Sequence, residues 1–375
     1  MTVGPIAFDA RAATPHFPGI GRTIVGLANA LAAGTRPPQM VILHNDRPHP
    51  GLALSRWPMQ ACRTTPFDLG QQWEIRLRLR RAAASMYHSP YYLMPYAPGV
   101  PAVVTCNDLI PLTVPGLFSP PARAGIRIAH AMAFRAASVI VVPSRATHDD
   151  VARLFPRHAG KLEVVPHGWD SIGDIDEVRA ARLRHELGVH GRYILAVGSN
   201  KPHKNLQVLV EAWATVAGRF DAGGTATALV LAGPRDPRFP DGGSTGERLA
   251  VAGRMVSVGP VSDETLAALY GGATLLVCPS RAEGFGLPVA EAMGLGVPVV
   301  CSRAPALVEV AGCAGAHFDS DDPGGLARLI ERLLGAPDER EAMRHAGFTR
   351  AAELTWARAA ERMSTLYARV AGGLA

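Results

Sequence analysis

Two glutamates in the second half of the chain, Glu283 and Glu291, flank a glycine-rich turn. Gly284 and Gly286 would expose backbone N–H groups, and Pro288 suits the first residue of a helix. Glu283 would then lie in the loop before this helix, and Glu291 would lie one turn into it, about 4.5 Å further along the axis. Carboxylates accept hydrogen bonds from paired hydroxyl groups. The segment therefore predicts a site for a ligand with two sugars, such as a nucleotide-sugar.

The alternative for this segment is a capped helix with a favourable glutamate in its first turn. That arrangement explains Glu291. It explains neither Glu283 nor the Gly-x-Gly run, so the ligand site is the stronger interpretation.

A second candidate segment holds two of the three lysines of the chain, Lys201 and Lys204. It follows the apolar run Tyr193–Val197 and a glycine turn, and it precedes a helix expected to begin near Asn205. A lysine at a helix N-terminus binds phosphate well, because backbone N–H groups and the helix dipole attract the anion and the ammonium group adds charge. An ordinary solvated turn is the alternative, but the scarcity of lysine elsewhere favours a phosphate site.

Two segments of the first half give weaker signals. Gly19 and Gly21 form a turn that opens a helix and could let the backbone approach a diphosphate, but no dinucleotide-binding GxGxxG pattern is present, so a plain turn is favoured. Asn107 and Asp108 follow the apolar run Ala102–Thr105, where polar side chains could meet a substrate. A local turn closed by an Asn or Asp side chain is an equal alternative there.

Short β-branched runs alternate with longer helical stretches throughout the chain, which is typical of βαβ winding. The runs are apolar on both faces, as expected for parallel strands covered by helices. They comprise residues 6–8, 40–43, 102–105, 139–142 and 162–165, followed by 193–197, 228–231, 255–258, 275–277 and 297–300. The sequence therefore predicts an α/β protein with two doubly wound domains. All four candidate segments follow a strand, which is where such sheets bind ligands.

Between residues 169 and 192 the chain is polar and helical before the second series of strands begins, so a domain boundary is expected there. An amphipathic helix is expected over residues 356–370. The predicted domains are residues 1–168 and 169–353, with residues 354–375 forming the last helix.

The composition excludes several classes of protein. The chain has 375 residues, long enough for two domains, and its 48% hydrophobic and 19% charged residues exclude intrinsic disorder. The net charge of +6 fits anionic small ligands or an acidic membrane surface, but it is too small and dispersed to indicate nucleic acid. The five cysteines include no CxxC pair, and neither a signal peptide nor an apolar run of about 18 residues is recognisable. A cytoplasmic protein is therefore expected. Because no HExxH run or complete acidic cluster is found, no metal is expected.

Taken together, the motifs resemble those of the GT-B glycosyltransferases, specifically the retaining family-4 group with many bacterial mannosyltransferases of polysaccharide assembly. The resemblance runs nearly end to end, and the Glu283–Glu291 segment is its most specific part. The other matching segments are residues 8–11, 19–22, 87–90, 107–111, 142–144, 166–168, 202–205, 258–262 and 354–356. The resemblance implies two Rossmann-like domains that face a central cleft and a final helix that crosses back to the N-terminal domain.

The resemblance also implies a role for each motif. Glu283 would hold the hydroxyls of the donor sugar, Glu291 would hold the ribose, and Lys204 would neutralise the diphosphate. The other residues implied at the donor are Gly19, Gly21, Ser199, Lys201, His203, Gly259, Val261, Gly284, Phe285, Gly286 and Leu287. Asn107 and Asp108 would join Glu283 and Lys204 in catalysis. The acceptor would lie against three residues of the N-terminal domain, namely His88, Tyr91 and Tyr92.

Two positions depart from the family pattern. His203 stands where the family usually has an arginine, and Lys201 stands where an acidic residue is common, so the positive charge is expected to have moved within the loop. Asn107 stands where a histidine is usual. An asparagine can hydrogen-bond a sugar hydroxyl, but it cannot become cationic or shuttle a proton.

The resemblance predicts retaining transfer of a hexose from a nucleotide-diphosphate sugar, with GDP-mannose as the first expected donor, to a saccharide or lipid-linked saccharide. Arginines alternate with apolar residues over Glu74–Arg81, which would suit peripheral contact with the anionic inner face of a membrane. A solvated surface helix is at least as good an interpretation of that segment. Two other functions stay open, a non-catalytic nucleotide-sugar-binding partner subunit, suggested by Asn107, and a GT-B epimerase that needs no acceptor.

Overall fold

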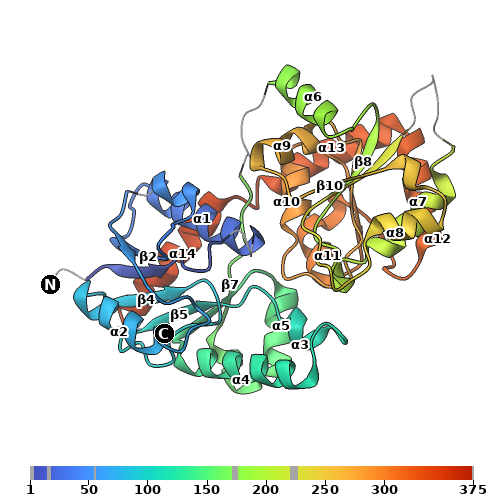
Figure 1. Cartoon of the computed structure of the whole chain (residues 1–375). Coiled ribbons are helices and arrows are strands. Elements are labelled where there is room, and N and C mark those ends of the chain that lie inside the picture. The colour runs from blue at the N-terminus through green and yellow to red at the C-terminus, as the bar shows by residue number, and fades with distance from the viewer. Residues whose placement is uncertain (1–3, 15–17, 55, 171–175, 220–226, 374–375) are drawn as a thin grey trace. The chain divides into compact units, whose positions relative to one another are not determined.

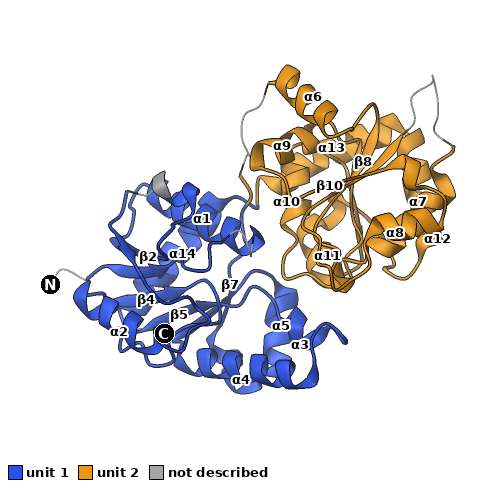
Figure 2. Cartoon of the chain, viewed as in Figure 1, with its two compact units in different colours: residues 1–168, 354–375 blue, residues 169–353 orange. Residues whose placement is uncertain are grey.

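The computed structural model describes residues 4–14, 18–54, 56–170, 176–219 and 227–373 (Figure 1). The chain divides into two compact units (Figure 2). Unit 1 is formed by residues 1–168 and 354–375, and unit 2 by residues 169–353. The chain passes between the units at the two positions where the sequence places its boundaries.

Unit 1 contains a sheet of seven parallel strands in the order β3-β2-β1-β4-β5-β6-β7. Its central strand β1 pairs with β2 on one side and β4 on the other, so that Phe8 lies opposite Ile42 and His88. Strands with helices on both faces bury both sets of alternating side chains, which explains the continuous apolar runs. The strands are β1 (Ile6–Asp9), β2 (Met40–His44), β3 (Met59–Ala61), β4 (Met86–Ser89), β5 (Ala102–Thr105), β6 (Val139–Val142) and β7 (Leu162–Val164).

Helices cover both faces of this sheet (Figure 1). One face carries α2 (Gln71–Arg81), α4 (Pro120–Ala136) and α5 (Arg145–Leu154), which share a hydrophobic core with the strands. On the other face α1 (Pro18–Ala33) packs against α14 (Trp356–Ala371). A Cβ atom at Gly26 of α1 would lie 2.4 Å from the Trp356 ring, so only glycine allows this close approach. The remaining helical segments are α3 (Ile110–Thr113) and the 3-10 turns Pro50–Leu54 and Pro156–Lys161.

Unit 2 repeats this arrangement with six parallel strands in the order β10-β9-β8-β11-β12-β13. The strands are β8 (Tyr193–Val197), β9 (Ala228–Ala232), β10 (Met255–Gly259), β11 (Leu275–Cys278), β12 (Val299–Ser302) and β13 (Ala316–Phe318). The helices are α6 (Glu177–Glu186), α7 (Leu206–Val216), α8 (Gly242–Arg248), α9 (Asp263–Gly271), α10 (Leu287–Gly294), α11 (Pro305–Ala311), α12 (Pro323–Gly335) and α13 (Pro337–Ala351), with 3-10 turns at Pro202–Lys204, Ala252–Arg254 and Gly312–Ala314. The two parallel sheets confirm the α/β, doubly wound prediction.

The structure differs from the sequence prediction at four strands. β3, β4 and β13 were not predicted, because β3 and β13 are short edge strands and β4 carries the polar side chains of His88 and Ser89. β12 begins at Val299 and not at Val297, since Pro298 has no N–H group to donate to the ladder.

A buried ion pair fixes the carboxyl end of β1. The Arg11 guanidinium donates to both Asp9 carboxylate oxygens at 2.9 and 2.7 Å, and also to the Thr64 carbonyl and to Gln71 of α2. The Tyr87 hydroxyl donates to the same carboxylate at 2.5 Å. Arg11 and Asp9 are almost fully buried. The network therefore ties β1, β4 and α2 together.

We expect Arg11→Met to lower the free energy of unfolding by about 3–5 kcal/mol, because it leaves the Asp9 carboxylate buried without a counter-charge. Urea denaturation at pH 7 measures this change. Arg36→Met, which alters an exposed arginine after α1, serves as the control and should change stability by less than about 0.5 kcal/mol. A loss below about 1 kcal/mol for Arg11→Met would show that the pair does not support the unit.

Candidate functional site

The loops that follow β8 and β11 in unit 2 are joined to each other. The backbone N–H of Arg281 donates to the His203 carbonyl at 2.7 Å. The Asn205 side-chain amide donates to the Pro279 carbonyl at 3.1 Å and to the Ser320 carbonyl at 2.7 Å. Asn205 takes a left-handed conformation (φ 54°) between the 3-10 turn and α7, as predicted for the point where a helix begins. The lysine-containing segment and the glutamate segment thus meet at one edge of the sheet.

Lys204 and Glu283 form the centre of this site. The Lys204 ammonium lies 2.7 Å from Glu283 Oε1, and the Ser280 hydroxyl donates to the same oxygen at 2.6 Å. The Glu283 side chain is only 9% exposed. Burial alone would raise its pKa, but the charge and hydrogen bond of Lys204 and the bond from Ser280 outweigh burial and lower the pKa. The carboxylate therefore stays ionised and ready to accept hydroxyl hydrogens.

The glycine-rich turn leads directly into α10. Gly286 has φ 105°, and a Cβ atom there would lie 2.6 Å from Leu307, so both backbone and packing require glycine. The helix begins at Leu287, which makes Pro288 its second residue and not its first. The N–H group of Leu287 has no acceptor within the helix, because first-turn N–H groups lack one. Gly284 and Phe285 are buried beside this helix start.

Glu291 lies on α10, as predicted, with a buried carboxylate. It accepts a hydrogen bond of 2.8 Å from the Tyr270 hydroxyl on α9. Tyr270, 21 residues away, was not identified from the sequence. One carboxylate oxygen is therefore oriented by the protein itself.

His203 carries no positive charge in this loop at neutral pH. Burial, aided by the nearby charge of Lys204, lowers its pKa to about 4. Its Nδ1 atom is buried and lacks a hydrogen-bond partner among the described residues. The half-buried Ser199 and Lys201 lie in the same loop after β8. The positive charge of the loop therefore resides on its two lysines.

Two further residues predicted at the donor, Gly259 and Val261, lie further along the same sheet. Gly259 ends β10 with φ 67°, and its carbonyl accepts a hydrogen bond from the Gly233 N–H group at the end of β9. Val261 follows two residues later and is half-buried. In the strand order, β9 separates β10 from β8.

In unit 1 the structure holds Asn107 in place on both sides of its amide group. Its Nδ2 atom donates to the Pro90 carbonyl at 3.1 Å, and its Oδ1 atom lies 3.0 Å from His167 Nε2. Burial lowers the pKa of His167 to about 3, so the ring is neutral and donates through Nε2. Asp108 accepts the N–H group of Ile110 at 2.9 Å, which is the local turn considered as the alternative for this segment. His167, 60 residues from Asn107, was given no role by the sequence.

The position of His88 argues against the predicted contact with an acceptor. Its ring is fully buried in β4, with Nδ1 2.6 Å from the Tyr367 hydroxyl of α14 and Nε2 2.9 Å from the Thr105 hydroxyl. Both ring nitrogens are thus bonded inside the core. Tyr91 and Tyr92 are half-buried, with ring centroids 4.6 Å apart, and Tyr92 stacks on His130 at 3.8 Å.

Gly19 and Gly21 lie in the first turn of α1, so they are helical and do not form a loop before the helix. Gly19 is exposed, and a Cβ atom there would meet no atom of the described residues within 4 Å. Packing within unit 1 therefore does not account for glycine at that position.

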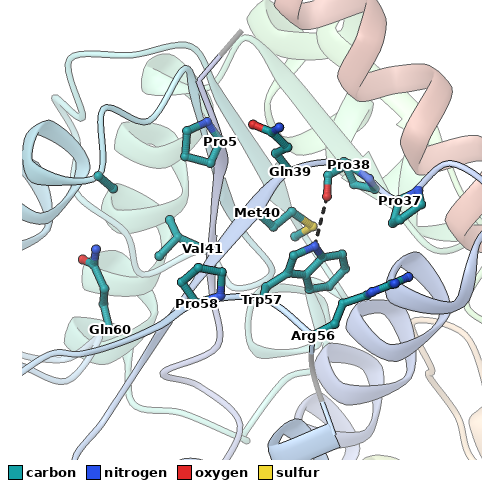
Figure 3. A pocket seen from close by; sticks show the side chains of 11 residues that line it. Pro5, Pro37, Pro38, Gln39, Met40, Val41, Arg56, Trp57, Pro58 and Gln60 are labelled. Atoms are coloured by element: carbon teal, nitrogen blue, oxygen red, sulfur yellow. Dashed lines mark hydrogen bonds between the residues drawn. The ribbon is translucent and has the colours of Figure 1, made fainter. Parts of the chain in front are cut away.

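A pocket of about 620 Å³ lies at the other edge of the unit 1 sheet (Figure 3). Pro5, Gln39 and Pro58, which line it, each immediately precede a strand, so it opens at the amino ends of the strands. Trp57 closes one side by donating to the Pro38 carbonyl at 3.0 Å. The predicted site residues lie at the carboxyl ends, and we do not assign the site to this pocket.

Across the described part of the chain, no group of three or more His, Cys, Asp or Glu side chains could hold a metal ion. No described helix combines the length and hydrophobicity needed to cross a bilayer.

Known proteins match both halves of the chain. Residues 18–171 match the family described as Glycosyltransferase Family 4, and residues 191–336 match the one described as Glycosyl transferases group 1. The chain is 28% identical over 274 residues to the O-antigen chain mannosyltransferase B of Escherichia coli, covering 72% of this chain and 71% of that protein. It is 32% identical over 241 residues to the D-inositol 3-phosphate glycosyltransferase of Corynebacterium efficiens, covering 62% of this chain and 56% of that protein.

The fold is similar to that of Anabaena HepE in complex with UDP-glucose. The TM-score is 0.76 at 18% identity, over 97% of this chain and 99% of that chain. This likeness shows the fold, which consists of two Rossmann-like domains of the GT-B type. Together with the two family matches, it leads to one assignment: the chain belongs to the family-4 type of GT-B glycosyltransferases.

Proposed function

We propose that the protein is a retaining glycosyltransferase that moves a hexose from a nucleotide-diphosphate sugar to a saccharide or lipid-linked saccharide. The observation that carries this proposal is the contact of Lys204 with Glu283 at the carboxyl edge of the unit 2 sheet, beside the start of α10. A cation for a diphosphate and a carboxylate for sugar hydroxyls lie there within one hydrogen bond of each other.

In the proposed reaction the acceptor hydroxyl attacks the anomeric carbon from the face that the diphosphate leaves. The bond between this carbon and the diphosphate oxygen breaks, a new glycosidic bond forms, and a diphosphate oxygen takes the acceptor proton. Lys204 and the N–H groups at the start of α10 stabilise the negative charge that develops on the diphosphate, so the scheme assigns no role to a metal ion. Glu283 orients the sugar through its hydroxyls.

GDP-mannose is the first proposed donor, supported by the mannosyltransferase among the relatives. The UDP-glucose bound by the structural neighbour makes UDP-sugars the principal competitors. We place the protein in the cytoplasm, with peripheral contact to the inner face of a membrane where a lipid-linked acceptor resides.

A non-catalytic nucleotide-sugar-binding subunit is the second candidate. It is favoured by Asn107, whose amide is held by Pro90 and His167 and cannot transfer a proton. Such a subunit would bind the donor without turnover.

We expect one nucleotide-sugar to raise the melting temperature of the protein, because a ligand at 100 times its dissociation constant stabilises the folded state by about 2.7 kcal/mol. Thermal-shift measurements with GDP-mannose, UDP-glucose and ADP-glucose identify the nucleotide without knowledge of the acceptor. Lys204→Ala should reduce the shift. If none of the three ligands changes the melting temperature, the proposed donor site is wrong.

A further inference from the structure

The pocket at the amino ends of the unit 1 strands is separate from the site that contains Lys204 and Glu283 (Figure 3). Its volume of about 620 Å³ lies within the range of about 300–1,000 Å³ that is usual for small-molecule sites. Met40, which lines it, is the first residue of β2, and the carboxyl end of that strand lies about 13 Å away at 3.3 Å per residue. A single sugar residue therefore cannot occupy the pocket and the carboxyl edge of the sheet at once.

The backbone around the pocket is fixed by the sheet. The carbonyl groups of Pro5, Gln39 and Pro58 each accept an N–H group from the neighbouring strand segment, at 3.0, 2.8 and 2.9 Å. Two further lining residues, Pro37 and Pro38, are prolines like Pro5 and Pro58, and a proline has no N–H group to offer. Recognition of polar groups on a ligand therefore falls mainly to side chains, and little ordering of the backbone is needed on binding.

Trp57 gives the pocket an aromatic wall with a fixed orientation. Its ring N–H group donates to the Pro38 carbonyl at 3.0 Å, and the residue is half-buried. Because this N–H group is used inside the protein, the ring offers a ligand its apolar surface. An aromatic ring held in this way packs well against a flat apolar surface, and the C–H face of a pyranose ring is such a surface.

The lining also contains a side-chain amide that lacks a hydrogen bond. The Oε1 atom of Gln60 on β3 is buried, and no described residue donates to it. The amide turns easily about its last bond, so it can present its oxygen or its nitrogen to the pocket. In Figure 3 the Gln60 side chain and the Trp57 ring lie on either side of Val41 and Pro58. An entirely apolar ligand would leave the amide without a partner, which costs free energy.

The charges around the pocket favour a neutral ligand. Arg56 is the one charged residue among the described lining residues, and the other polar side chains are the amides of Gln39 and Gln60. Arg56 is exposed, and one of its guanidinium nitrogens donates to the Ala32 carbonyl at 3.1 Å. A nucleotide would bring several negative charges to this single arginine. Hydroxyl groups, in contrast, both donate to and accept from an amide, so the lining suits a neutral polyhydroxyl ligand.

We propose that this pocket is a second saccharide-binding site, which holds one pyranose unit with its C–H face on Trp57 and a pair of neighbouring hydroxyl groups at the Gln60 amide. The exposed Gln39 and Arg56 meet hydroxyl groups of an adjoining sugar. Because the pocket lies a strand length from the carboxyl edge, it holds the saccharide away from the reaction and takes no part in the transfer itself. The proposal goes beyond the proposed function and shares with it only the class of ligand.

Saturation-transfer difference NMR on the full-length protein tests this site with the methyl α-pyranosides of mannose, glucose, galactose and rhamnose. We expect at least one of them to bind, with the strongest transfer to the C–H protons that face the indole ring. Trp57→Ala should weaken this binding by about tenfold or more. Gln60→Leu should weaken it by about fivefold.

Gln60→Leu also separates binding from folding. It replaces a buried amide that lacks a partner by an apolar side chain of similar size, so the melting temperature should stay the same or rise while glycoside binding weakens. A lower melting temperature with unchanged binding would show that the amide serves the fold, which contradicts the proposal. Trp73→Ala and Gln207→Leu are the matched controls, because both residues are exposed and neither lines the pocket, and they should leave binding unchanged.

The proposal is overturned if none of the four glycosides binds, or if the Trp57 and Gln60 variants bind them as well as the wild type. It is also overturned if adenosine or uridine monophosphate binds in place of the glycosides with the same sensitivity to Trp57→Ala, because the pocket is then a nucleotide site.

Transfer to a water-soluble acceptor distinguishes this proposal from the proposed function. At saturating acceptor the rate should be the same in Gln60→Leu as in the wild type. Loss of transfer together with glycoside binding in this variant would place the pocket in the acceptor site and contradict a separate site. Absence of transfer in the wild type, with glycoside binding still sensitive to Trp57→Ala, would refute the proposed function and leave the second saccharide site standing.

Discussion

We expect Lys204→Ala and Glu283→Ala each to abolish sugar transfer, lowering kcat/KM by about 100- to 1,000-fold or more, the size of effect seen when one group that stabilises a transition-state charge is removed. Lys204 supplies the positive charge facing the leaving diphosphate, and Glu283 supplies the carboxylate that orients the sugar. Each also holds the other in place across a 2.7 Å contact. Initial rates of nucleoside diphosphate release, measured with saturating acceptor, test the expectation.

Two further variants make this test specific. Glu283→Gln keeps the shape of the side chain and removes its charge, so a loss of activity in a variant that melts like the wild type is assigned to chemistry and not to folding. Arg219→Ala, which removes an exposed surface ion pair with Glu331 in the same unit, should keep the rate within about twofold. Turnover like that of the wild type in both alanine variants would exclude this site from catalysis.

The second large effect is a steep loss of stability in mild acid. Four histidines, the buried His88, His130 and His203 and the half-buried His167, have pKa values lowered by desolvation to about 3, 4, 4 and 3 respectively. In the unfolded chain each imidazole titrates near 6.5. Between these values the unfolded state binds more protons than the folded state, so acid favours unfolding. Stability is therefore full above about pH 6.5 and falls as the pH drops toward 4, by about 1.4 kcal/mol per pH unit for each histidine.

Urea midpoints measured from pH 7.5 to 5 test this dependence. Three of the four histidines lie in unit 1, so that unit should unfold first. His130 offers a matched variant, because its Nε2 atom has no partner among the described residues and its ring lies among Tyr92, Phe134 and Phe155. His130→Phe should make the pH dependence shallower by about a quarter. A midpoint that stays constant over this range would show that these rings titrate normally.

The sequence predicted the site best where residues of suitable chemistry follow strands that are neighbours in the sheet. Lys204 and Glu283 follow β8 and β11, which are neighbouring parallel strands, so the rule that ligands bind at strand ends was enough to bring them together. Their residue types indicated a phosphate ligand and a hydroxyl acceptor, and the family resemblance implied their specific roles at the diphosphate and the donor sugar. The fold class followed from apolar runs that parallel strands must have when both faces are covered.

Contacts between segments that lie far apart in the chain could not be predicted from the sequence. The family resemblance implied that His88 lies at an acceptor, but its hydrogen-bond partner Tyr367 lies 279 residues away and both residues are buried in the core. His167 was missed as the partner of Asn107 for the same reason. Ser280 was missed although it lies only three residues before Glu283, since nothing in its type distinguishes it from other serines.

In the arginine-rich segment Glu74–Arg81, the structure shows which apolar side chains are buried, and the sequence pattern alone could not show this. Its alternation of arginine and apolar residues predicted either a membrane contact or a solvated helix. The structure buries Ile75 and Leu79 and leaves Trp73 and Leu77 exposed. This division separates the residues that build the core of the unit from those that remain exposed on its surface.

Following a labelled sugar from the donor tests the central claim most directly. Purified protein is incubated with the nucleotide-sugar found by thermal shift, radiolabelled in the hexose, and with membrane lipid extract or saccharides as acceptors. Our account predicts that label appears in a glycoside with retained anomeric configuration, together with an equal amount of nucleoside diphosphate, and that Glu283→Gln yields neither product. Donor that stays bound but unchanged would identify a binding subunit, and donor converted to another nucleotide-sugar without acceptor would identify an epimerase; either result contradicts the account.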